Sequence, residues 1–403
     1  MGSLAQLDVM AMRIRQSSLE FAPAQRKQRV TPSRSTPGGF NKLGIISKAL
    51  LPLLLIVCAF ASSALAHSLF VVARLSDAVA VIDDSTDQII TRIPVGDGPV
   101  RITMSPDRLK AYVSNGTAAT VSVLDTVALT TTATIQLGSK SRPQESAVTP
   151  DGGRLFVIHQ LSPTVTVIDT ATNLVITNVF IGGHQAKDIL FTLDGRFAYI
   201  ANYSQGTVNV IDTATYQVTT IPTAAGPRRL AISPAGDRVF VTNNLGNSVS
   251  VIDTGTQQLI ATIPVGEKPR GIAITPSGDA IYVGNVQGGT VSIIDSSTLT
   301  VIDTITVGIK PWEVIITEDG TLAFVSSSVS GTVSVIDTAT RKVIKMLATG
   351  SGSFFSAINP DGNRFYVSNS NDTTVTVVDI PSLTVLHVIP DVGSYPFDMA
   401  FGP

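Results

Sequence analysis

One short motif recurs eight times in this sequence and limits the fold more than any other feature. Each copy alternates apolar, mostly β-branched residues with small ones and carries aspartate at its sixth position; residues 332–338 read TVSVIDT. A two-residue alternation of this kind is typical of a β-strand with one buried face. The aspartates are Asp83, Asp125, Asp169, Asp212, Asp253, Asp295, Asp337 and Asp379. They are 41 to 44 residues apart, a period that indicates stacked units or propeller blades.

Three further strand-like runs accompany each copy of the motif. In the unit around Asp295 the four runs are 270–275, 280–285, 290–295 and 301–308. Segments rich in Gly, Pro, Asn, Asp and Ser separate them, as tight turns require. Four short antiparallel strands in about 42 residues are typical of a propeller blade. We therefore predict an all-β fold, a β-propeller of eight four-stranded blades, with seven blades as the alternative.

The two ends of the repeated region predict how the ring closes. The first unit begins at Ser68 with its second, third and fourth strands, and the first innermost-type strand comes only at 100–105. Residues 396–403 align with 269–276, and there the sequence ends. We expect three N-terminal strands to pair with one C-terminal strand, because this arrangement leaves no open sheet edge in the ring.

The N-terminal region differs from the repeats in composition. Residues 1–48 hold eight of the basic residues and only two acidic ones, and we expect this segment to be disordered. Residues 49–66 are uncharged and mostly apolar, and end in Ala64-Leu65-Ala66. A basic segment, an apolar stretch and an A-x-A site together predict a signal peptide, with an uncleaved membrane anchor as the alternative. We expect export of the propeller domain, 67–403, to the periplasm or cell surface, with membrane contact only through 49–66 if that segment stays uncleaved.

Charge and cysteine content exclude several classes of function. The single cysteine, Cys58, lies in the apolar segment, so the domain that follows has no disulfide and no thiolate nucleophile. Of 28 basic and 30 acidic residues, 20 and 28 fall in 67–403, a formal net charge of −8. Such an acidic domain lacks the basic surface of a nucleic-acid binder, and we expect no nucleic-acid partner. We expect a monomer.

A second recurring motif carries a family resemblance. It reads YVSN at 112–115, FVTN at 240–243, YVGN at 282–285 and YVSN at 366–369, each followed by a VSVIDT-like and an IPVG-like strand. In this order of motifs the chain resembles the YVTN-type β-propeller repeat family over essentially all of 67–403. The resemblance implies an exported bacterial or archaeal propeller. Related propellers include lactonases and domains of redox enzymes, so it implies the fold more firmly than the function.

The strand order gives the ring two faces. We call upper the face that holds the loops from each fourth strand to the next first strand, and from second to third strands; the opposite face is lower. The recurring aspartates fall on the lower face beside turns such as Pro150-Asp151-Gly152. Because one occurs in every blade, we expect each to form hydrogen bonds within its own turn and not to bind calcium.

Residues that break the repeat gather, by strand order, at the upper mouth of the central channel. They follow the start of each first strand and mix basic, acidic and aromatic side chains. Convergent polar groups beside aromatic ones are typical of a ligand site. The alternative is a set of salt bridges between blades with local packing. The predicted ligand-binding residues are Arg101, Glu145, Lys187, Asp188, Arg228, Arg229, Arg270, Trp312, Glu313, Phe355 and Asp398.

Signals for catalysis are weak. The four histidines, His67, His159, His184 and His387, lack metal-ligand spacing, and there is no G-x-S-x-G or phosphate-loop motif. We expect a non-enzymatic exported propeller without a cofactor that binds a ligand or an envelope protein through its upper channel face. One alternative is a lactonase-like hydrolase, with a divalent metal held in the channel by Glu145, Asp188, Glu313 and Asp398. Another is a structural cell-surface module.

Overall fold

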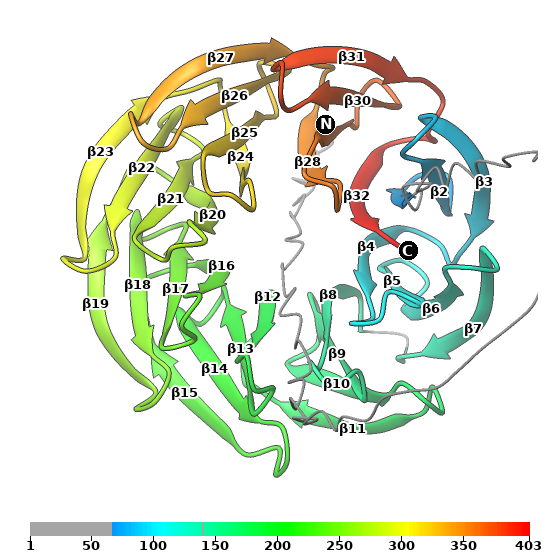
Figure 1. Ribbon diagram of the computed structural model, residues 1–403. Coiled ribbons are helices and arrows are strands. Elements are labelled where there is room, and N and C mark those ends of the chain that lie inside the picture. The colour runs from blue at the N-terminus through cyan, green and yellow to red at the C-terminus, as the bar shows by residue number, and fades with distance from the viewer. Residues whose placement is uncertain (1–66, 139–140) are drawn as a thin grey trace, which may run out of the picture. The chain divides into compact units, whose positions relative to one another are not determined.

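The computed structural model describes residues 67–138 and 141–403. The predicted segments 1–48 and 49–66 therefore lie outside the described residues. All secondary-structure elements of the described part are β-strands. Within these residues no helix is long and apolar enough to cross a membrane. The strands form eight four-stranded sheets that surround one channel as propeller blades (Figure 1). The prediction of eight blades is confirmed, and the alternative of seven is wrong.

Each blade places its four strands in order from the channel to the rim. The innermost strands are β32 (Pro396–Phe401), β4 (Pro99–Met104), β8 (Pro143–Val148), β12 (Ala186–Phe191), β16 (Pro227–Ile232), β20 (Pro269–Ile274), β24 (Pro311–Ile316) and β28 (Ser353–Ile358). The second strands are β1 (Ser68–Ala73), β5 (Lys110–Asn115), β9 (Arg154–His159), β13 (Phe197–Asn202), β17 (Arg238–Asn243), β21 (Ala280–Asn285), β25 (Leu322–Ser327) and β29 (Arg364–Asn369).

The third strands carry the aspartate motif. They are β2 (Ala78–Asp83), β6 (Thr120–Asp125), β10 (Thr164–Asp169), β14 (Thr207–Asp212), β18 (Ser248–Asp253), β22 (Thr290–Asp295), β26 (Thr332–Asp337) and β30 (Thr374–Asp379). The outermost strands are β3 (Gln88–Pro94), β7 (Thr130–Gln136), β11 (Val175–Phe180), β15 (Val218–Pro222), β19 (Gln258–Pro264), β23 (Thr300–Thr306), β27 (Lys342–Ala348) and β31 (Thr384–Ile389).

The first blade joins the two ends of the propeller as the sequence predicts. Its strand order is β3-β2-β1-β32, and Leu69 of β1 pairs with Phe401 of β32. The Ser68 backbone N–H donates to the Pro403 carbonyl at 3.2 Å, and the Gly402 N–H donates to the Ser68 carbonyl at 2.8 Å. The ring is therefore closed by hydrogen bonds between residues more than 300 positions apart.

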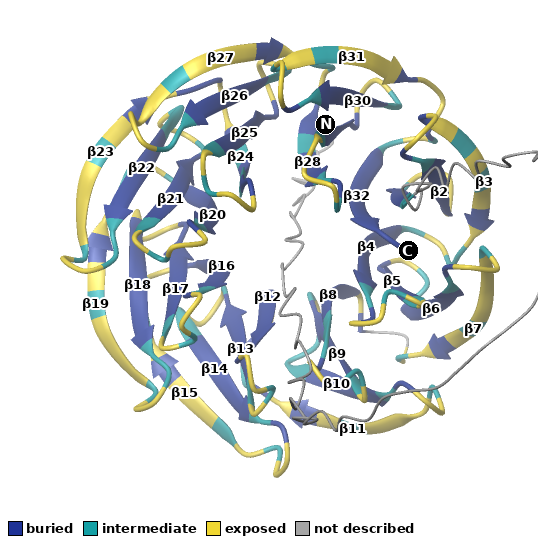
Figure 2. Ribbon diagram, viewed as in Figure 1, coloured by how far each residue is buried: buried dark blue, intermediate teal, exposed yellow. Residues whose placement is uncertain are grey.

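The core lies between neighbouring blades. The innermost, second and third strands are mostly buried, whereas the outermost strands expose most of their residues at the rim (Figure 2). The third residue of every second strand is aromatic and at most 1% exposed; these residues are Phe70, Tyr112, Phe156, Tyr199, Phe240, Tyr282, Phe324 and Tyr366. Burying one such ring contributes about 1.5–3 kcal/mol, so one aromatic side chain per blade stabilises each interface between blades.

The recurring aspartates form turns, as expected from their recurrence. In the turn after β22 the Asp295 carboxylate accepts hydrogen bonds from the backbone N–H groups of Ser297 (3.0 Å) and Thr298 (2.8 Å). Comparable bonds, from the residue two or three positions on, occur at all eight aspartates. The Ser297 hydroxyl, which donates to the same carboxylate at 2.6 Å, and the hydrogen bonds from Thr298 lower the pKa of Asp295 to about 2.

Replacing Asp295 by alanine is expected to lower the melting temperature in a pH-dependent way. The folded pKa lies below the ordinary value near 4, so the carboxylate contributes stability above about pH 4 and loses it as the pH falls through about 2. Thermal unfolding from pH 7 to pH 2 measures this, and the difference from the wild type should shrink at the acid end. Asp97→Ala, at an exposed aspartate, is the control. A pH-independent difference would contradict the turn role.

Candidate functional site

The candidate site lies at a β-bulge near the start of the innermost strands. In β4, Pro99 pairs with Asn115 and Arg101 with Ser114, so two steps along β4 face one step along β5. Register shifts occur at the corresponding place in all eight innermost strands. Bulges bend a strand and redirect its side chains. The second and third residues of these strands are the positions that the sequence analysis singled out.

Five of the predicted residues form one ion-pair network across five consecutive blades. Arg101 Nε lies 2.9 Å from Glu145 Oε2, and Arg101 Nη1 lies 3.6 Å from Asp398 Oδ1. Arg229 Nη1 lies 3.4 Å from both Glu145 Oε2 and Asp188 Oδ1. Each of these residues is at most 8% exposed. Glu145 thus contacts Arg101 of the preceding blade and also Arg229, which lies two blades further along the ring. Contacts across this span place the network inside the ring.

Three of the acidic side chains also bind the backbone of the next blade. In each case the carboxylate accepts a hydrogen bond from the N–H of the fourth residue of the neighbouring innermost strand. The pairs are Asp398 with Ile102 (2.9 Å), Asp188 with Leu230 (2.8 Å) and Glu313 with Ser356 (2.7 Å). The salt bridges between blades that the sequence analysis gave as an alternative are therefore present, and these acids contribute to holding the ring together.

An aromatic cluster lies beside the ion-pair network. Trp312 of β24 contacts Phe354 of β28 with ring centroids 4.9 Å apart, and Phe355 contacts Phe397 of β32 at 4.6 Å. Tyr395, just before β32, stacks on Phe397 at 5.9 Å. Phe355 and Phe397 are buried, whereas Trp312, Phe354 and Tyr395 remain partly exposed. The cluster therefore offers an aromatic surface at the channel.

Basic side chains lie against aromatic rings on both sides of the network. The Arg270 guanidinium carbon is 3.4 Å from the centre of the Trp312 ring, and that of Arg101 is 4.7 Å from the Phe355 ring. Lys187 lies 5.3 Å from the Tyr203 ring, with Arg228 nearby at 5.9 Å. Such stacking orients the cations and keeps them near apolar surface.

Burial changes the charge balance of the site. Burial raises the pKa of Glu313 to about 8, although hydrogen bonds from Ser356 lower it in part. Burial likewise raises the pKa of Asp398 to about 7, although the charge of Arg101 opposes the shift. Burial also raises the pKa of Glu145. At neutral pH part of the acidic charge is lost, and the five basic residues of the predicted set outweigh the acids.

Several donors at the site have no hydrogen-bond partner among the described residues. They are Nη2 of Arg101, Nη2 of Arg229 and Nε1 of Trp312, all buried. Buried donors are normally paired, and leaving one unpaired costs about 1–3 kcal/mol. The surplus of donors and positive charge suits a ligand that carries an anionic, acceptor-rich group.

The predicted residues do come together, but they are more buried than an open channel mouth implies. Ten of the eleven are buried and only Trp312 is partly exposed. The sequence analysis missed Tyr203 and Tyr395, which take part in the ring contacts. Tyr203 could have been found, because it follows the recurring asparagine at a position where no other blade has an aromatic residue.

His159 ends the second strand β9, at the position where most other second strands end in asparagine, and it forms a hydrogen bond within its own blade. His159 Nε2 lies 2.8 Å from Thr166 Oγ1, and burial lowers the pKa of this imidazole to about 4. It is therefore neutral at physiological pH. It borders a hollow of about 450 Å³ on the third blade; the lining includes Leu161 and Asn178 and none of the predicted ligand-binding residues.

Comparisons with known proteins support the fold. No protein-family profile matches the chain, and no curated protein matches it. Among solved structures, dihydro-heme d1 dehydrogenase NirN in complex with DHE has a TM-score of 0.70 at 17% identity, over 83% of this chain and 74% of that one. Hydrazine synthase of Kuenenia stuttgartiensis has a TM-score of 0.58 at 23% identity, over 70% of this chain and 95% of that one. A functionally unknown protein from Desulfotomaculum acetoxidans DSM 771 has a TM-score of 0.60 at 18% identity, over 83% and 98%. At these identities the likeness concerns the fold alone.

Proposed function

We propose that this protein is an exported propeller of the YVTN type that binds an anionic group, on a small molecule or an envelope protein, through its upper channel face. Export rests on the basic, apolar and A-x-A order of residues 1–66. Membership of the family rests on the YVTN-like motifs. NirN was solved in complex with DHE, and we carry ligand binding by this fold over to the present chain as part of the proposal.

One observation carries the binding function. A partly exposed aromatic surface, Trp312 with Phe354 and Tyr395, lies beside buried arginines that retain unpaired donor atoms. Tryptophan and arginine give large contact energies when a partner desolvates them. A planar or apolar body would lie on the aromatic rings, and its anionic group would face the Arg101 and Arg229 guanidiniums.

The lactonase-like alternative receives less support from the geometry. A metal-assisted hydrolase needs carboxylates that converge on one ion with a position open for water. Here Glu145, Asp188 and Asp398 face guanidinium groups, and Glu313 accepts the hydroxyl and N–H of Ser356. A cation placed among these acids would compete with the arginines that already neutralise them.

Trp312→Ala is expected to weaken binding by more than tenfold, because truncating a central tryptophan costs about 2 kcal/mol or more. Thermal-shift screening with benzoate, citrate, inorganic phosphate and a Glu-rich peptide would select the probe, and calorimetry would measure its dissociation constant. Phe180→Ala is the matched control, since Phe180 is an aromatic residue 68% exposed on the outermost strand β11. If the control weakened binding as much as Trp312→Ala, or if Trp312→Ala bound normally, the upper channel face would be the wrong site.

A further inference from the structure

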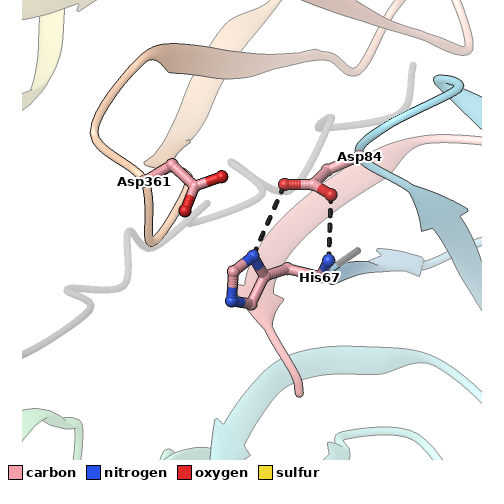
Figure 3. A group of neighbouring side chains, drawn as sticks. All are labelled: His67, Asp84 and Asp361. Carbon is pink, nitrogen blue, oxygen red and sulfur yellow. Dashed lines mark hydrogen bonds and ion pairs between the residues drawn. The ribbon is translucent and has the colours of Figure 1, made fainter. Parts of the chain in front are cut away.

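Three side chains meet on the lower face at the seam between the first and last blades (Figure 3). His67 lies just before β1, Asp84 just after β2, and Asp361 in the turn between β28 and β29. One nitrogen or carboxylate oxygen from each lies within 4.8 Å of the others. Among residues 67–138 and 141–403, this is the one group of at least three His, Cys, Asp or Glu side chains close enough to share a metal ion.

Asp84 departs from the repeat. Six of the other blades have threonine or serine at this position. The Thr126 and Thr338 hydroxyls, for example, donate to the carbonyls of Arg108 (2.7 Å) and Gly320 (2.6 Å) in the adjacent turn. A carboxylate cannot donate that bond. Asp84 is nevertheless only 5% exposed, so a buried acid stands where the blade needs only a hydroxyl.

Asp361 departs from the repeat in its bonding. The aspartates at the same place in four other turns accept a hydroxyl hydrogen bond from a turn serine or threonine; they are Asp107, Asp151, Asp194 and Asp319. In the last blade Asn359 takes the serine position, and its own side-chain oxygen accepts the N–H groups of Asn363 and Arg364. Within the described residues the Asp361 carboxylate forms no hydrogen bond or ion pair, so it is available to a ligand.

The contact between His67 and Asp84 has the spacing of two ligands of one ion. His67 Nδ1 is 3.8 Å from Asp84 Oδ2, which is too long for a hydrogen bond. Nδ1 is shielded from solvent and has no hydrogen-bond partner among the described residues. Two atoms that each lie about 2.0–2.2 Å from an ion are at most about 4.4 Å apart. The three ligand atoms lie within 4.8 Å of one another, so the exposed Asp361 side chain would move toward the other two to complete the set.

We propose that His67, Asp84 and Asp361 bind a divalent transition-metal ion. One imidazole nitrogen and two carboxylate oxygens form a mixed set that suits Zn²⁺ and similar ions and leaves a coordination position for water. The Asn359 amide donates to Asp84 Oδ2 at 3.3 Å and fixes the orientation of this ligand.

Removal of residues 1–66 at the site predicted in the sequence would strengthen the binding. The His67 backbone nitrogen already lies 2.9 Å from Asp84 Oδ1, on the same side as the ring nitrogen (Figure 3). Cleavage after Ala66 would convert this amide into a primary amine. The amine and Nδ1 of one histidine can then chelate the same ion. This step alone rests on the proposed export; the three-residue site does not.

Calorimetric titration with Zn²⁺ tests the site in the full chain and in the form that begins at His67. We expect one bound ion, tighter binding in the processed form, and at least a tenfold loss in Asp84→Asn and in Asp361→Ala. Asp361 is exposed, so Asp361→Ala should keep the melting temperature of the metal-free protein. Asp319→Ala, at the equivalent turn of the seventh blade, and His387→Gln are controls that should bind as the wild type does.

The outcomes separate the two parts of the inference. Loss of Zn²⁺ binding in both aspartate variants with normal binding in both controls supports the site. No binding by the wild type, or unchanged binding in Asp361→Ala, overturns it. Equal affinity in the full and processed chains overturns only the amine contribution. A response to Ca²⁺ with none to Zn²⁺ also overturns the proposal, because an imidazole ligand favours the softer ion.

Discussion

Arg101→Ala is expected to destabilise the protein by about 3–5 kcal/mol, a large fraction of the stability of an ordinary domain. The Arg101 side chain is 1% exposed, lies between the Glu145 and Asp398 carboxylates, and covers the Phe355 ring. Its removal leaves two buried acids with less neutralising charge and opens a cavity beside the aromatic cluster. Equilibrium unfolding in urea at pH 8 measures the loss.

The loss should depend on pH in a defined direction. Burial raises the pKa of Glu145 and that of Asp398, the latter to about 7, while Arg101 opposes the shift. Without Arg101 both pKa values rise further. A carboxyl with a raised folded pKa contributes stability at low pH that is lost as the pH rises through that value. The variant should therefore lie closer to the wild type at pH 5 than at pH 8.

The matched control is Arg92→Ala on the outermost strand β3. The exposed Arg92 donates one hydrogen bond to the Asp391 carbonyl, so we expect a cost below about 1 kcal/mol. If Arg101→Ala cost no more than Arg92→Ala, or if its cost grew toward acid pH, the network would not be a structural element of the ring. In that case the arginines would serve ligand binding and would not stabilise the ring.

The fold could be predicted from the sequence because every blade repeats the same local information. Strand alternation, turn residues and the aspartate at the end of the third strand are each present eight times, so an ambiguity in one blade is removed by the others. Closure could be predicted because the first and last units are complementary in their missing strands. Both inferences concern the order of strands and turns, which is determined by residues that are close together in the sequence.

That these residues gather at the channel could be predicted, but which of them pair with one another could not. The third residue of each innermost strand is fixed by the repeat. That Arg229 meets Glu145, two blades away, as well as Asp188 of the neighbouring blade depends on long side chains and on the bulge. The proposed metal site could not be predicted from the sequence for a related reason. His67 and Asp361 are 294 positions apart, and only the closed seam brings them together.

Deleting residues 394–403 is expected to abolish cooperative folding of the ring. The deletion removes β32, which pairs with β1, packs Met399 and Phe401 into the core between the first and last blades, and carries Asp398. Arg101 would lose one of its acidic partners, and the Ile102 N–H its acceptor. The bared edge of β1 would offer unpaired backbone groups to other chains. We expect aggregation, measured by light scattering, and no sharp thermal transition.

A circular permutant separates the pairing from the covalent order of the chain. Ser68 and Gly402 are hydrogen-bonded, so a short linker can join Pro403 to Ser68, and new ends can be opened between Gly182 and Gly183 in the loop before β12. This permutant keeps all 32 described strands and should melt cooperatively near the wild-type temperature. Deleting β32 from the permutant should again unfold it, because the blade needs its innermost strand wherever the ends lie. A truncated wild-type chain with an unchanged transition would show instead that seven complete blades suffice, and that the pairing of β1 with β32 adds little to the stability of the ring.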